Sequence, residues 1–270
     1  MKHNRFFRLA WAGRLLLPLL LSLIWATEAS AEIDTLSSAI NKAGRQRMLT
    51  QRIVKAYCLV GLKVQSSRHR KQLRGAVALF DSQLSELKAY APSPEISDAL
   101  DRVEQLWTPF KSMAEGEINR QNAIQLLEQD GALLASAHEV VVLLVKHSTT
   151  PVGRLVNLAG RQRMLSQRLA KFYMARAWNI ELPELQNNMQ IAATEFEDAL
   201  NTELITSASN TGEIQKELNK AAKQWSLYKR GLKLEQDSGD YIPVIMATTS
   251  ENLLKMMNKI TGMYEKISDK

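Results

Sequence analysis

A twelve-residue segment occurs twice in this chain, almost unchanged. NKAGRQRMLTQR begins at Asn41 and NLAGRQRMLSQR begins at Asn157. The similarity continues outside this motif, because WTPFK at Trp107 corresponds to WSLYK at Trp225. Self-similarity over so long a period indicates that one structural unit is duplicated along the chain. We therefore expect two related halves, in which Trp107 and Trp225 are core anchors at corresponding places.

Each half has the sequence pattern of four helices. Apolar residues recur at spacings of three and four, and strict alternation is scarce. Breaks such as APSP at Ala91 and HSTTPVG at His147 separate the segments. We expect helices over about 34–63, 67–90, 95–115 and 119–148, and then over about 152–179, 183–207, 212–236 and 241–268. Since short connections favour antiparallel neighbours, the predicted fold is all-α, with two tandem antiparallel four-helix bundles over 32–149 and 150–270.

The first 31 residues predict a secretory signal peptide. A cationic start, MKHNRFFR, precedes the apolar run LLLPLLLSLIWA, and ASAE offers a cleavage site after Ala31. The apolar run is short for a membrane span, so an uncleaved N-terminal anchor is the weaker alternative. We expect the remaining chain to be soluble and periplasmic.

Charge and composition argue against several classes of function. The net charge of +7 falls to +4 without residues 1–31, which carry Lys2, Arg5, Arg8 and Arg14 against Glu28. This mild excess does not indicate a nucleic-acid partner, because an exported protein does not normally meet nucleic acid. The four histidines lack metal-ligand spacing, and no nucleophile motif or glycine-rich phosphate loop is present. The single cysteine, Cys58, cannot form an internal disulfide. We therefore expect no catalysis, no cofactor, no metal and no nucleic-acid partner.

Each motif helix is expected to pack on two faces. At about 100° per residue, Leu49 and Ile53 lie on the side that suits the helix's own bundle. The opposite side carries a stripe that both copies share: Gly44, Arg47 and Gln51 in the first, and Gly160, Arg163 and Gln167 in the second. Its spacings of three and four are those of a second helix–helix interface. An arginine stands at the centre of that face, and the glycine one turn earlier leaves room beside the guanidinium.

The sequence around these arginines contains no acid that could neutralise them. From Thr35 to Phe80 there are ten Lys and Arg and no Asp or Glu, and from Val140 to Ile180 there are seven cations and no acid. Solvated helices usually mix both signs. If the two motif helices pack along their arginine faces, two like charges meet out of water. A small oxyanion between them would compensate both charges through forked hydrogen bonds.

The alternative is that these arginines pair with carboxylates of other helices, with Glu104, Glu128, Glu139 and Glu251 as candidates. The residues alone leave both interpretations open. In the first interpretation the anion ligands are Arg47, Arg163, Gly44, Gly160, Gln51 and Gln167, and the candidates to assist them are Arg45, Arg161, Asn41 and Asn157.

The two dodecamers closely resemble the signature of the PilJ/NarX-like sensor domain. This is the extracytoplasmic N-terminal domain of type IV pilus chemotaxis transducers and of nitrate/nitrite sensor kinases. The resemblance implies a four-helix bundle whose first helix carries the motif. It also implies that, as in the nitrate sensors, one arginine from each of two facing helices holds a nitrate; the matching residues are Arg47 and Arg163. Gly44 and Gly160 match the family's glycine.

The motif is closer to the version in the pilus transducers, because Arg45 and Arg161 stand where the nitrate sensors have small or uncharged residues. The family's transmembrane pair, coiled signalling domain and kinase are not found in this sequence. We therefore expect a soluble periplasmic sensor or binding protein for a small oxyanion, nitrate or nitrite first, which signals through a separate membrane sensor kinase or transducer. The alternative is a non-catalytic helical interaction module of chemotaxis or two-component signalling that docks proteins through the motif face. The sequence also leaves open whether two copies of the protein form a homodimer.

Overall fold

Eight α-helices and one π-helical segment make up the fold in the part of the chain that the structure describes. The computed structural model describes residues 33–148, 151–238 and 241–268; the predicted signal peptide lies outside them. The elements are α1 (Leu36–Gly61), α2 (Ser66–Tyr90), α3 (Pro94–Glu115), α4 (Arg120–His147), α5 (Pro151–Ala177), α6 (Leu185–Asp198), η1 (Ala199–Leu204), α7 (Gly212–Ser238) and α8 (Pro243–Ser268). No strand occurs among these residues, which confirms the all-α prediction. None of the described helices combines the length and apolar character needed to cross a membrane.

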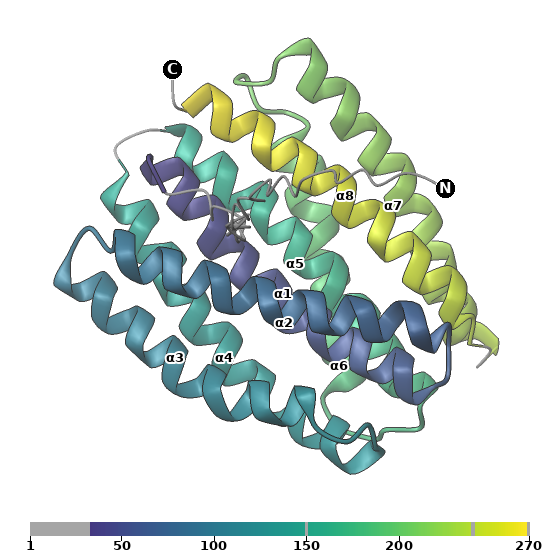
Figure 1. Ribbon diagram of the computed structural model, residues 1–270. Helices are drawn as coiled ribbons and strands as arrows, with labels where there is room; N and C mark the ends of the chain where they lie inside the picture. The colour runs from purple at the N-terminus through teal and green to yellow at the C-terminus, as the bar shows by residue number, and fades with distance from the viewer. Residues whose placement is uncertain (1–32, 149–150, 239–240, 269–270) are drawn as a thin grey trace, which may run out of the picture. The chain divides into compact units, whose positions relative to one another are not determined.

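The two motif helices, α1 and α5, lie at the centre of the fold, as Figure 1 shows. α1 packs against α2 and α4, and α3 completes this first bundle by packing against α4. α5 packs against α6 and α8, and α7 completes the second bundle by packing against α8. α1 and α5 also pack against each other over an extensive interface. The two repeats are therefore joined through their motif helices, within one compact unit (Glu32–Lys270). The predicted boundary between 149 and 150 falls outside the described residues and remains a prediction.

Polar residues at the breaks in the sequence set where several helices begin. Thr35 caps α1, since its hydroxyl accepts a 3.1 Å hydrogen bond from the backbone N–H of Ser38. Asn119 caps α4 in the same way, with 2.8 Å between its Oδ1 and the N of Asn122. At α3, Ser93 takes the cap position and Pro94 is the first helical residue, where its missing N–H removes no hydrogen bond. These caps place the helix starts within a few residues of the predicted ones.

The aromatic residues of the repeat form the same cluster in both bundles. Trp107 stacks on Phe80 with 3.9 Å between ring centroids, and Trp225 stacks on Phe196 with 4.4 Å. All four residues are buried. Trp107 and Trp225 are therefore core anchors, as the repeat predicted, and the two bundles are built around equivalent contacts.

One segment differs from the sequence-based expectation. We expected a single helix over 183–207, whereas α6 ends at Asp198 and continues as the π-helical η1. In this wider turn Leu200 and Leu204 are both fully buried, and the hydroxyl of Thr202 donates to the carbonyl of Asp198. Helical periodicity in the sequence does not distinguish an α-turn from a π-turn, because the same apolar positions serve both.

Candidate functional site

The two motif arginines meet inside the α1–α5 interface. Arg47 is 1 % exposed and Arg163 is 0 % exposed. A Cβ atom added to Gly44 would lie 3.4 Å from Nη2 of Arg47 and 3.3 Å from Nη2 of Arg163. A Cβ atom added to Gly160 would lie 3.8 Å and 3.1 Å from the same two atoms. Both guanidinium groups therefore lie over both glycines, in space that larger residues would fill.

Neutral groups surround the guanidinium of Arg47. Its Nη1 is 3.0 Å from Nδ1 of His138 on α4, and its Nη2 donates to Oδ1 of Asn157 on α5 at 2.8 Å. The second contact crosses from one repeat to the other. None of these partners carries the negative charge that would compensate the arginine.

Arg163 has a corresponding set of partners. Its Nη1 donates to Oδ1 of Asn258 on α8 at 3.0 Å, and its Nη2 donates to the backbone carbonyl of Asn41 on α1 at 3.1 Å. Within the described part of the chain, neither Arg163 nor Arg47 forms an ion pair with a carboxylate. The Nε–H groups of both arginines are buried and make no hydrogen bond to any described residue. Two buried cations thus retain unused donors.

The electrostatics of the site are unfavourable to two positive charges. Burial is the main cause that lowers the pKa of Arg47 to about 9, and the charge of Arg161 adds to it. Burial also holds the pKa of Arg163 well below its ordinary value, with further lowering by Arg45 and Arg47. Because a guanidinium stays protonated in nearly all proteins, these shifts express how strongly the site disfavours its own charge. An anion bound there would remove that penalty.

The two flanking arginines take up peripheral places in the cluster. Arg161 forms a 2.8 Å ion pair with Glu195 on α6, and its charge acts on Arg47. The charge of Arg45 lowers the pKa of Arg163. Burial lowers the pKa of Arg45 itself, and the charges of Glu265 and Glu86 raise it. Four arginines therefore gather at the interface, with carboxylates at its edge rather than its centre.

The structure brings some of the predicted ligands together and directs others elsewhere. The glycines lie at the guanidinium groups, and Asn157 and Asn41 hydrogen-bond to them, although Asn41 does so through its backbone and its side chain donates to Glu265. The two glutamines are fully buried but bond to other groups. Gln51 donates to Thr50, and Gln167 donates to the carbonyl of Ser250.

Three of the four carboxylates considered as arginine partners form ion pairs with other residues. Glu104 pairs with Lys88, Glu139 with Arg102, and Glu251 with Arg52 and Lys55. In the described structure, neither these three nor Glu128 bonds to Arg47 or Arg163. The pairing alternative for the two central arginines therefore has no support in the geometry.

Sequence reasoning missed two buried lysines on the same helices. Lys55 on α1 is 0 % exposed and pairs with Glu251 on α8; Lys171 on α5 is 2 % exposed and pairs with Asp130 on α4. Burial is the main cause that lowers the pKa of Lys55 to about 8. Each pair joins the motif helix of one repeat to the last helix of the other. The sequence feature that points to them is a lysine two turns after each motif arginine, in RMLTQRIVK and RMLSQRLAK.

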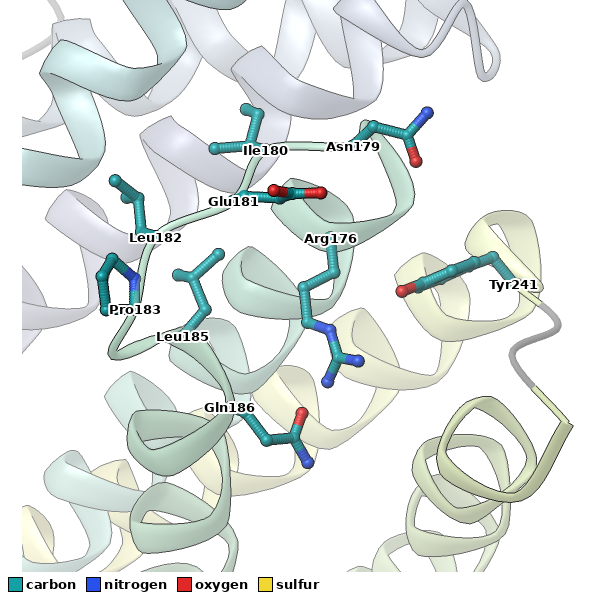
Figure 2. Close-up of a pocket in the computed structure, with 9 residues that line it drawn as sticks. All are labelled: Arg176, Asn179, Ile180, Glu181, Leu182, Pro183, Leu185, Gln186 and Tyr241. Carbon is teal, nitrogen blue, oxygen red and sulfur yellow. The ribbon is translucent and has the colours of Figure 1, made fainter.

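A separate pocket of about 640 Å³ lies where α5 leads into α6, and Figure 2 shows it. Its lining contains none of the predicted ligands and consists of Arg176, Asn179, Ile180, Glu181, Leu182, Pro183, Leu185, Gln186 and Tyr241. Asn179 turns the chain out of α5 with a φ of 53°, in the left-handed region that asparagine tolerates. This pocket is therefore distinct from the arginine cluster. The described residues also contain no group of histidine, cysteine and acidic side chains arranged to hold a metal ion.

Comparison with known proteins agrees with the repeat. No curated protein and no solved structure matched the chain. A match was found to PilJ, the type IV pili methyl-accepting chemotaxis transducer N-terminal family, over residues 29–136 and again over 147–244. The two matched segments cover well over half of the chain, and each contains one copy of the arginine motif. The chain belongs to the PilJ family, with two tandem copies of its helical unit.

Proposed function

We propose that this protein is a periplasmic sensor or binding protein for a small oxyanion, with nitrate and nitrite as the first candidates. The observation that carries the proposal is the pair of buried guanidiniums, Arg47 and Arg163, which approach each other with neutral partners only. Family membership adds that the fold serves in signalling, as the N-terminal part of chemotaxis transducers.

The geometry suits a small planar anion. Arginine presents its N–H donors in a rigid fork that matches the oxygens of a carboxylate-like group. Here two forks come from helices that the duplication relates to each other, so one chain supplies what a symmetric dimer would otherwise build from two. The unused Nε–H groups of Arg47 and Arg163 add donors on the same side chains. We expect the anion to shift the packing of α1 on α5, which a separate membrane kinase or transducer would detect.

Docking of proteins through the motif face is the less favoured function. A docking surface has to be accessible, whereas both central arginines are at most 1 % exposed and the face is covered by the other repeat. The observed burial therefore argues for an internal ligand rather than for a surface partner.

Isothermal titration of the purified protein with nitrate, nitrite, sulfate and chloride at low salt tests the proposal. We expect one oxyanion to bind per chain, and Arg47→Met to weaken its binding by at least about 100-fold, since an arginine supplies two or more charge-assisted hydrogen bonds of about 1.5–3 kcal/mol each. Arg154→Met is the matched control, because Arg154 lies on α5 with a side chain that is 69 % exposed. Absence of binding by all four anions would contradict the proposal.

The glycine beside the arginines offers a subtler test. Gly160→Ala places a Cβ 3.1 Å from Nη2 of Arg163, which is shorter than ordinary van der Waals contact, so the guanidinium has to shift by a few tenths of an ångström. We expect about 10-fold weaker anion binding, which corresponds to about 1.4 kcal/mol. Gly75→Ala on α2 meets nothing within 4 Å and serves as the control, with unchanged anion affinity and slightly higher stability. Equal anion affinities of the two variants would show that the space beside Gly160 is irrelevant to binding.

A further inference from the structure

The two halves of the arginine site differ in one chemically important residue. Arg47 contacts His138 on α4, and Arg163 contacts Asn258 at the corresponding place on α8. Both contacts are 3.0 Å long. An asparagine stays neutral at every physiological pH, whereas a histidine gains a charge within that range. One half of the site can therefore respond to pH and the other cannot.

The contact with Arg47 defines the protonation state of His138. A guanidinium has donors only, so Nδ1 of His138 has to accept the hydrogen bond, and the neutral imidazole carries its proton on Nε2. Protonation converts Nδ1 into a donor, and the bond to Arg47 is then lost. The released N–H of Arg47 and the new N–H of His138 would both need an acceptor, and a bound anion provides one.

We propose that His138 is a ligand of the anion, and that the protein takes up a proton on His138 when the anion binds. This inference rests on the proposed oxyanion site. It makes the affinity for a non-titrating anion rise as the pH falls, and it gives the sensor a combined response to the anion and to acidity.

The charges around His138 support a rise in anion affinity as the pH falls. Burial is the largest cause that lowers the pKa of His138, and the charges of Arg47 on α1 and Arg161 on α5 lower this pKa further. The charge of Glu195 on α6 raises it. From α3, Arg102 faces this part of α4 but is ion-paired with Glu139. An anion beside Arg47 cancels the positive field, so the pKa of His138 rises in the complex. A group whose pKa rises on binding takes up protons, and the bound state is favoured at low pH.

Proton uptake is accessible to measurement in the unmodified protein. We expect nitrate, which does not titrate between pH 5.5 and pH 8, to bind roughly 10-fold more tightly at the lower pH, within the usual range of coupling between two sites. Near pH 6, the heat of nitrate binding should differ between two buffers of unequal ionisation enthalpy, because the buffer supplies the proton. Equal heats in both buffers and equal affinities at both pH values would overturn the inference.

Two variants assign the effect to this residue. His138→Asn reproduces the partner found at Asn258 and should bind nitrate with little dependence on pH. His147→Asn, at the exposed end of the same helix, should keep the pH dependence of the wild type. A wild-type pH dependence in His138→Asn would overturn the assignment, and His138→Gln provides a second neutral variant if the first folds poorly. Failure of the wild type to bind nitrate at either pH would overturn the proposed function as well, whereas pH-independent nitrate binding would overturn only the role of His138.

Discussion

Arg163→Met is expected to make the anion-free protein more stable than the wild type, by about 1–2 kcal/mol in the free energy of unfolding. Replacing a buried, uncompensated charge with an apolar side chain of similar volume removes a desolvation penalty. The hydrogen-bond partners left behind lose little, because Asn258 is exposed to solvent and the backbone carbonyl of Asn41 lies within α1. Urea denaturation in a buffer without oxyanions measures the difference.

In the same experiment with nitrate, we expect the wild type to be more stable than Arg163→Met. Wild-type protein should gain about 2.7 kcal/mol at a nitrate concentration 100 times its dissociation constant, and Arg163→Met should gain almost nothing. Arg154→Met, with its exposed side chain, should respond to nitrate as the wild type does. If Arg163→Met were strongly destabilised without nitrate, the arginine would be a structural residue and the anion site would lose its energetic basis.

Asp130→Asn is expected to lower the free energy of unfolding by about 3 kcal/mol. Asp130 is the carboxylate partner of Lys171, and both side chains are buried. Removal of one partner of a buried ion pair leaves the other charge uncompensated, which typically costs about 3–5 kcal/mol. Burial already lowers the pKa of Lys171, so neutralisation of the lysine limits the loss. Chemical denaturation at pH 7 measures the effect.

The double variant Asp130→Leu/Lys171→Met separates charge from packing. Since both charges are removed together, we expect it to recover most of the stability lost in Asp130→Asn. An equal loss in the single and the double variant would mean that shape, rather than charge, determines the contribution of this contact between α4 and α5. Asp98→Asn on the exposed face of α3 is the control, with a change within about 0.5 kcal/mol.

The repeat made most of the fold predictable. Helical periodicity and polar breaks located the starts of all the described α-helices to within a few residues, because short polar caps and prolines act locally. The arginine stripe also indicated a second packing face, and the structure packs α1 against α5 through Arg47 and Arg163. That inference needed only the angular position of each residue on an ideal helix.

The partners of the motif residues could not be found in the same way. Arg47 and Arg163 are 116 residues apart in number, whereas their contacts His138 and Asn258 are 120 apart, because the connections differ in length between the repeats. A fixed offset therefore fails to pair these two residues. For the same reason, a fixed offset does not show that Asp130 and Glu251 are the acids that pair with the two buried lysines. Which side chains meet across helices is determined by tertiary packing and not by local pattern.

The central claim is that one small oxyanion binds between Arg47 and Arg163 of a single chain. A crystal structure of the protein grown with saturating nitrate tests it most directly. We predict a planar trigonal anion with oxygens about 2.7–3.2 Å from guanidinium nitrogens of both arginines. Nitrate bound elsewhere, or a carboxylate side chain between the two guanidiniums, would contradict the claim.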